Sequence, residues 1–183
     1  MPRLGFGLPL VSSVQESPIT LIEDLLWEDI DTNNNISVNY QETRTNSVLY
    51  SQDTTQAEQW TKTNTAIDST LYEAPDGTNT ANGIKSDSTG TKVYRILQSS
   101  LSVTAGKTYT LSVHVKKGTL GFARVQFNDG SIDYSADFNL NTAAITNTSN
   151  TIRTQVDSID NDWYRCSITF QAQNTTSSGV AYV

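Results

Sequence analysis

The chain carries few residues that could act as catalytic groups. Its one histidine, His114, has no Asp, Cys or second His nearby at metal-ligand spacing, which favours a surface role. Its one cysteine, Cys166, lies in a strand-like stretch, where a packed small hydrophobic residue is expected rather than a reactive thiol. The motifs of serine hydrolases, nucleotide-binding loops, zinc proteases and calcium-binding loops do not occur. We therefore expect a protein that is not an enzyme and has no cofactor or metal site.

Clustered carboxylates leave a glycoside hydrolase open as an alternative. The clusters are Asp133 with Asp137, and Asp157 with Asp160 and Asp162. Such an enzyme needs two carboxylates roughly 5 to 10 Å apart across a sugar cleft. Turn chemistry explains residues 160–162, and Asp137 alternates with an aromatic residue on an expected strand. Both observations favour a structural role for the carboxylates.

Aromatic residues suggest a second kind of site, a surface that binds sugars. Sugar-binding β-sandwiches stack sugar rings on Trp and Tyr, while Asn, Asp, Gln and Arg bond the hydroxyls. The candidate ligand-binding residues are Tyr50, Trp60, Tyr94 and Tyr134. The structural and the sugar-binding role are hardest to separate for Trp60, because its sequence neighbours are polar. Its ring either packs against another part of the protein or faces a ligand. For Trp163, Tyr164 and Phe170, which share one expected strand, we predict a structural role.

Composition and charge limit the classes of protein to which the chain can belong. With 183 residues and a hydrophobic content of 36%, the chain has room for one β-rich domain and an extension. A formal net charge of -7 argues against a nucleic-acid partner, which would need clustered Lys and Arg. A single cysteine excludes an intramolecular disulfide. No apolar run approaches the about 20 residues that insert across a membrane, and we expect synthesis in a cytoplasm without secretory export.

The elements that would position these residues are mostly strands. Stretches with alternating polar and apolar residues occur at 93–98, 109–117, 122–127, 134–140, 151–156 and 163–172. Turn residues separate them at 74–77, 88–90, 105–107, 128–130 and 160–162. In the stretch 109–117, Tyr109, Leu111, Val113 and Val115 should face a core. This spacing predicts an antiparallel β-sandwich over residues 46–183. Residues 177–183 begin a further strand with no turn after it, which leaves open whether the sandwich is complete.

Residues 1–45 differ in composition and are interpreted as an N-terminal arm. The first ten alternate apolar residues with Gly and Pro, a pattern that can add a strand to a partner's sheet. Apolar residues between positions 17 and 30 recur at helical spacing and predict a short amphipathic helix. The helix either covers the domain's own core or docks on a partner. The candidate partner-binding residues are Leu4, Phe6, Leu8, Ile22, Leu25, Leu26 and Trp27.

Four segments resemble, in the same order, a recurrent domain of tailed-bacteriophage structural proteins. They are NSVLYSQDTTQAEQWTKTNTAI (46–67), APDGTNTANGIKSD (74–87), LSVTAGKTYTLSVHVKKG (101–118) and NDWYRCSITFQA (161–172). That family is similar to the jelly-roll sandwiches of carbohydrate-binding modules. The opening MPRLGFGLPL also resembles the Arg-Leu-Gly-Leu-Gly-Leu starts of phage tail and fibre proteins. The family's final strands would follow residue 183, so the resemblance also leaves closure of the sandwich open.

The resemblance implies a structural protein of the virion, made in the host cytoplasm and displayed on the particle. Its expected place is a tail fibre or other tail appendage, with tail, adaptor or baseplate proteins as partners of the arm. It also implies a homotrimer, with Trp60 and Trp163 as scaffold. Two alternatives stay open. One is a module that binds host-surface glycans during adsorption, and the other is a capsid decoration or head-fibre protein.

Overall fold

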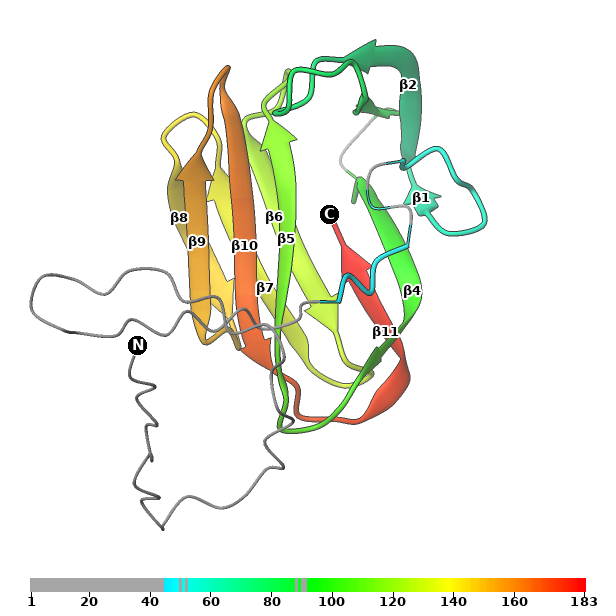
Figure 1. The fold of residues 1–183 in the computed structure, drawn as a ribbon, viewed down its shortest axis with the longest axis vertical. Coiled ribbons are helices and arrows are strands. Elements are labelled where there is room, and N and C mark those ends of the chain that lie inside the picture. The colour runs from blue at the N-terminus through cyan, green and yellow to red at the C-terminus, as the bar shows by residue number, and fades with distance from the viewer. Residues whose placement is uncertain (1–44, 50, 52, 88, 90–91) are drawn as a thin grey trace, which may run out of the picture. The chain divides into compact units, whose positions relative to one another are not determined.

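The computed structural model describes residues 45–49, 51, 53–87, 89 and 92–183, and this part of the chain is mostly β (Figure 1). Its strands are β1 (Thr61–Thr63), β2 (Thr65–Tyr72), β3 (Ala81–Ser86), β4 (Arg95–Val103), β5 (Thr108–Lys116), β6 (Phe122–Asn128), β7 (Asp133–Asn139), β8 (Ala144–Ser149), β9 (Arg153–Ser158), β10 (Trp163–Gln171) and β11 (Thr176–Tyr182). The predicted arm, its helix and its anchor residues Leu4, Phe6, Leu8, Ile22, Leu25, Leu26 and Trp27 lie outside the described residues.

These strands form three sheets, and within each sheet every pair of neighbouring strands is antiparallel. The largest sheet has the order β1-β4-β11-β6-β7-β8, a second has the order β5-β10-β9, and β2 pairs with β3 in a separate ribbon. Figure 1 shows β5, β10 and β9 side by side, with β10 between its two partners. The antiparallel arrangement predicted from the turn spacing is therefore confirmed for the described residues.

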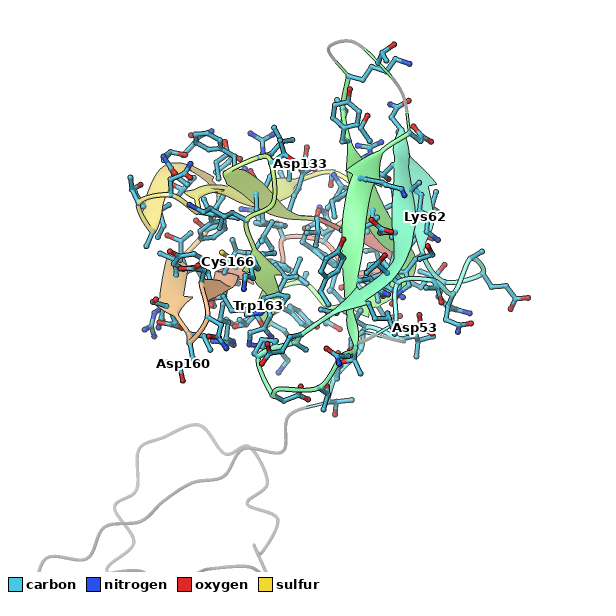
Figure 2. All side chains as sticks on the ribbon, turned by 90° about the horizontal axis from the view of Figure 1, so that it is seen from above. Asp53, Lys62, Asp133, Asp160, Trp163 and Cys166 are labelled. Atoms are coloured by element: carbon cyan, nitrogen blue, oxygen red, sulfur yellow. The ribbon has the colours of Figure 1, made fainter. Side chains whose placement is uncertain are left out.

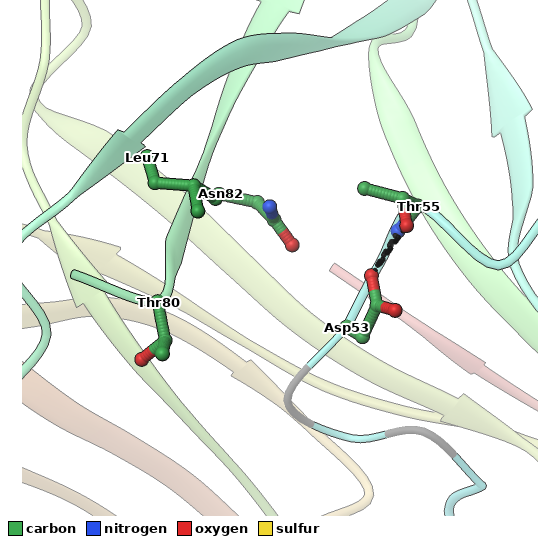
Figure 3. A pocket seen from close by; sticks show the side chains of 5 residues that line it. All are labelled: Asp53, Thr55, Leu71, Thr80 and Asn82. Carbon is green, nitrogen blue, oxygen red and sulfur yellow. Dashed lines mark hydrogen bonds between the residues drawn. The ribbon is translucent and has the colours of Figure 1, made fainter. Parts of the chain in front are cut away.

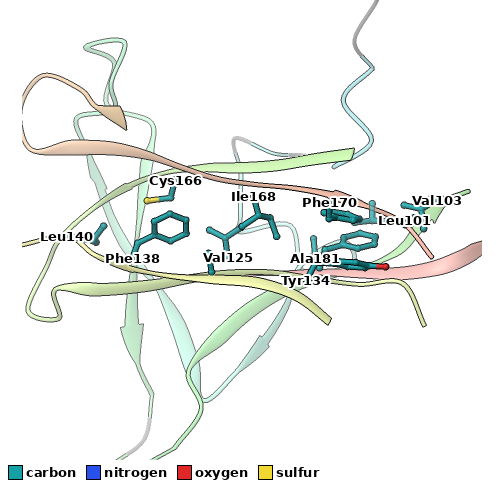
Figure 4. Close-up of a cluster of buried hydrophobic side chains, with 13 residues drawn as sticks. Leu101, Val103, Val125, Tyr134, Phe138, Leu140, Cys166, Ile168, Phe170 and Ala181 are labelled. Atoms are coloured by element: carbon teal, nitrogen blue, oxygen red, sulfur yellow. The ribbon is translucent and has the colours of Figure 1, made fainter. Parts of the chain in front are cut away.

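The core lies between the two larger sheets, because alternate residues of their strands point toward each other (Figure 4). The six-stranded sheet contributes Val125, Phe127, Tyr134, Ala136 and Phe138, and β10 contributes Cys166, Ile168 and Phe170. The predicted inward face of β5, formed by Tyr109, Leu111, Val113 and Val115, packs against this core and is confirmed. Each of these strands therefore has one side fixed by apolar burial.

Phe170 is the centre of an aromatic stack inside the core. Its ring centroid lies 4.4 Å from that of Tyr134 and 4.9 Å from that of Phe127. Tyr109 lies farther out, with a centroid separation of 6.0 Å. Rings at these separations pack with about 0.5–1.5 kcal/mol per pair beyond the burial of their area. The stack joins β5 and β10 of one sheet to β6 and β7 of the other.

The predicted strands correspond to β4, β5, β6, β7, β9 and β10, and the predicted C-terminal strand is β11. β11 pairs on both sides, with β4 and with β6. Beyond its end, the backbone groups of Val183 and Ile96 exchange hydrogen bonds of 2.9 and 3.0 Å. Gly179 is required in β11, because an added Cβ would lie 2.7 Å from both the Leu101 carbonyl oxygen and the Phe127 ring. The strands β1, β2, β3 and β8 were not among the six alternating stretches.

The start of the described domain is held by an amide from β4. Gln98 is buried, and its Oε1 accepts a hydrogen bond of 2.8 Å from the Leu49 backbone N–H. Its Nε2 donates a hydrogen bond of 2.9 Å to the Leu49 carbonyl. The Gln98 side chain thus makes the backbone hydrogen bonds to Leu49 that a neighbouring strand would otherwise make. The adjacent residue Val48 packs against the core.

A buried carboxylate joins the β6–β7 turn to the β10–β11 loop. Asp129 is 1% exposed and accepts six hydrogen bonds from described residues, all of them neutral donors. The Tyr134 hydroxyl donates at 2.6 Å and the Ile132 backbone N–H at 2.9 Å. From the other loop, the backbone N–H groups of Gln173 and Asn174 donate at 3.1 and 3.2 Å. We refer to these bonds as the Asp129 clamp.

The clamp keeps Asp129 ionised despite its burial. Desolvation on its own would raise the pKa of the carboxyl group. The hydrogen bonds from Tyr134, Ile132, Asn174 and Ser131 outweigh that cost and hold the pKa well below its usual value of 3.8. Because the pKa of Asp129 is lower in the folded state, its ionisation stabilises the fold above the ordinary pKa of 3.8 that it has in the unfolded chain. This stabilisation is progressively lost as the pH falls below that value toward the pKa in the folded state.

Replacing Asp129 by Asn should lower the free energy of unfolding at neutral pH by about 2–4 kcal/mol, because an amide leaves several buried donors without acceptors. Urea unfolding at neutral pH and below pH 4 measures the effect, and the difference from the unmodified protein should shrink at acidic pH. Asp160→Asn, at an exposed turn position, is the matched control and should change stability by less than about 0.5 kcal/mol. Equal stability of the Asp129 variant and this control would contradict the clamp.

Candidate functional site

The structure places two of the four candidate stacking rings in the interior. Tyr134 is 1% exposed because its position on β7 faces the core, and its ring lies against Phe170. The prediction of Tyr134 as a sugar platform is therefore wrong. Trp60 is 7% exposed, in agreement with the scaffold role that the resemblance implied and against the sugar role. The Trp in the polar stretch packs rather than facing a ligand.

The other two candidates stay predictions. Tyr94 is half-buried in the segment just before β4. Tyr50 lies outside the described residues. In β10 the predicted structural roles are confirmed, since Phe170 is buried and the Trp163 Nε1–H donates a hydrogen bond of 3.1 Å to the Glu73 carbonyl. The predicted surface position of His114 and the predicted packing of Cys166 are also confirmed.

Cys166 is unsuited to nucleophilic chemistry because it is fully buried. Burial first, and then the charge of Asp157, raise the pKa of its thiol to about 11. The thiolate is the reactive form, so the side chain stays protonated and inert at neutral pH. Cys166 acts here as a small apolar residue between the sheets.

The carboxylates considered for glycoside hydrolysis have structural partners. Arg124 contacts Asp137 through two hydrogen bonds of 2.5 and 2.8 Å, one to each carboxylate oxygen. The bond to Arg124 lowers the pKa of Asp137, although partial burial opposes it. A general acid needs a raised pKa, so Asp137 is unsuited to that role. Asp133 accepts hydrogen bonds from Gln126 and Asn128, and Figure 2 shows it at a distance from Asp160, so the two carboxylate clusters do not converge.

The outer face of the three-stranded sheet carries polar side chains that bond mainly to one another. Thr110 and Thr169 face each other with their hydroxyl oxygens 3.0 Å apart. Arg165 donates a hydrogen bond of 3.3 Å to Ser112 and forms an ion pair of 3.8 Å with Asp157. This pattern is typical of a solvated sheet face. Arg165 belongs to one of the segments that resemble the phage domain, and here its side chain takes part in cross-strand pairing.

A pocket outside the two larger sheets brings together residues that sequence reasoning missed. It is an open hollow with a volume of about 330 Å³, and the described residues that line it are Asp53, Thr55, Leu71, Thr80 and Asn82 (Figure 3). One wall is the turn that contains Asp53, and the other is the β2–β3 ribbon. The two walls are joined by Thr54, whose backbone N–H and hydroxyl donate hydrogen bonds of 3.1 and 3.0 Å to Asn82 Oδ1.

Asp53 is held as a carboxylate by its own turn. The Thr55 hydroxyl and the Gln56 amide donate to it at 2.5 and 2.7 Å, and the Thr55 backbone N–H donates at 3.0 Å. These bonds lower the pKa of Asp53, and the bond from the Thr55 hydroxyl has the largest effect. The sequence Asp-Thr-Thr is a signal for such a turn, but the opposite wall comes from strands that the alternation pattern did not reveal.

Comparison with known proteins gave no matching family model and no significantly similar curated relative. Within the described ranges, no group of three or more His, Cys, Asp or Glu side chains is placed to hold a metal ion. The described part of the chain also contains no helix long and apolar enough to cross a bilayer.

Replacing Arg124 by Met should raise the pKa of Asp137 toward its ordinary value, because the ionised carboxylate loses its main hydrogen-bond donor and countercharge. Carboxyl-carbon NMR titration measures this pKa directly. The matched control is Arg153→Met, since Arg153 bonds to Gln155 on another sheet and should leave the Asp137 titration unchanged. An unchanged pKa in the Arg124 variant would show that another group holds Asp137 ionised.

Proposed function

We propose that the chain is a non-enzymatic structural protein of a tailed-phage particle, in a tail fibre or another tail appendage. The observation that carries the proposal is that the residues behind the resemblance serve as scaffold. Trp60 and Trp163 are buried, and Cys166 lies in the core. Motifs that serve as scaffold fit a recurrent structural domain better than a catalytic one. The protein would be made in the host cytoplasm and displayed on the virion.

The strand pairing supports a jelly-roll-like sandwich for residues 46–183. A chain that folds back on itself as a jelly roll pairs its outer strands and then successive inner ones. Here β4 pairs with β11, β5 with β10 and β7 with β8. A strict jelly roll would also pair β6 with β9, but β6 lies between β11 and β7, and β9 lies in the other sheet. The proposed fold is therefore a variant in which β7–β8 and β9 exchange sheets.

The arm is proposed to anchor the protein through the apolar residues of positions 1–45. Tail, adaptor or baseplate proteins would be its partners, and a homotrimer would place several sandwiches side by side. Attachment to the capsid as a decoration or head fibre is the competing arrangement. The two differ in which virion protein the arm contacts.

Binding of the full-length chain to purified tails and to purified heads separates these arrangements. We expect capture by tails, and loss of capture for Leu25→Glu combined with Leu26→Glu, because charges would disrupt an apolar docking face. The matched control, Glu23→Gln with Asp24→Asn, changes polar positions of the same segment and should bind normally. Capture by heads would replace the tail assignment, and normal capture of the Leu25 and Leu26 variant would refute the arm as anchor.

A further inference from the structure

The pocket between the Asp53 turn and the β2–β3 ribbon has no role in the proposed structural function. We propose that it binds one neutral sugar residue, with the apolar side of the sugar ring on Leu71 and its hydroxyl groups bonded to Asp53 and Asn82. Figure 3 shows these three side chains around the same hollow. The inference does not rest on assembly into a particle, and the described residues that line the pocket include none of the aromatic residues considered from the sequence.

The apolar wall comes from one face of the ribbon. Ile67 pairs with Ile84 and Leu71 pairs with Asn82, so these four side chains lie on the same face. Leu71 and Ile84 are 52% and 48% exposed, which is high for large apolar residues on paired strands. An exposed apolar strip beside polar groups suits the C–H face of a sugar ring.

The opposite face of the ribbon is already used by the protein itself. The Tyr72 ring lies against Gly83, where an added Cβ would meet it at 2.8 Å. The Tyr72 hydroxyl donates a hydrogen bond of 3.4 Å to Asp68, and Lys85 forms an ion pair of 3.8 Å with the same carboxylate. The face with Leu71 and Asn82 is therefore the one that the ribbon presents to the pocket.

Hydrogen bonding fixes what the polar wall can recognise. Asn82 Oδ1 already accepts two hydrogen bonds from Thr54, which sets the orientation of the amide and leaves Nδ2 as its donor end. Asp53 is an ionised carboxylate and offers acceptors only. A sugar hydroxyl can accept from the amide and donate to the carboxylate, so adjacent hydroxyls satisfy both groups.

Charge and size narrow the ligand class further. Among the described residues, the lining contains one carboxylate and no cationic side chain, so the negative charge of Asp53 disfavours a uronic acid or a phosphate. Its volume of about 330 Å³ lies at the lower end of the range for small-molecule sites. These two properties favour a neutral monosaccharide unit, either free or at the end of a glycan.

Backbone NMR titration of the full-length protein tests the proposal. The probes are glucose, galactose and N-acetylglucosamine, with glucuronate as the anionic counterpart. We expect saturable shifts confined to residues 53–55, 71 and 82 with at least one neutral sugar, and weaker binding of glucuronate. An oligosaccharide ending in that sugar should bind at the same residues if the pocket serves glycans, whereas binding of the free sugar alone would assign the site to small metabolites.

Two variants and a control separate the contributions of Leu71 and Asp53 to sugar binding. Leu71→Ser should weaken binding of the neutral sugar by about tenfold, or about 1.4 kcal/mol. Ile152→Ser, which alters a similarly exposed apolar residue beside another sheet, should leave it unchanged. Asp53→Asn retains a side chain that can cap the turn and should reduce the discrimination against glucuronate. Absence of saturable shifts with every neutral sugar, or unchanged affinity of the Leu71 variant, would overturn the proposal.

Discussion

The Asp129 carboxylate is the interaction on which the described fold depends most. Among the described residues it has no cationic partner for its buried charge, and the surrounding neutral donors stabilise that charge. Its donors come from two loops that are distant in sequence, the β6–β7 turn and the β10–β11 loop. Since β6 and β7 belong to one sheet and β10 to the other, a single side chain links the two sheets at this end of the core.

The aromatic stack depends on the same clamp. The Tyr134 hydroxyl bonds to Asp129 while its ring packs on Phe170, so the polar and apolar parts of one side chain hold the same two sheets together. This arrangement explains why a tyrosine on a β-strand need not be a ligand platform. Elements outside the stack, such as the β2–β3 ribbon with its exposed Leu71 and Ile84, contribute little to the core.

Strands that bury one face could be predicted from the sequence, whereas strands without a buried face could not be predicted. In β5, apolar residues alternate with polar ones because one side meets the core, and the pattern shows it directly. Five of six side chains in β8 and three of six in β3 are exposed, and none in either strand is fully buried, so these strands need no alternation of polar and apolar residues. The motif Asn-Asp-Gly predicted a turn at 128–130, but nothing local indicates that Asp129 is buried, because four of its six bonds come from the residues 134, 173 and 174. The pocket was missed for the same reason, since its walls meet only in the folded chain.

Amide hydrogen exchange at Gln173 and Asn174 tests the central role of the Asp129 clamp most directly. Both N–H groups belong to a loop, and outside the clamp a loop amide exchanges quickly with water. The account predicts that they exchange as slowly as amides in the middle of β10, and that their protection falls selectively as the pH drops below about 4, where a carboxylate released by opening of the loop takes up a proton. Rapid exchange of these two amides at neutral pH would contradict the account.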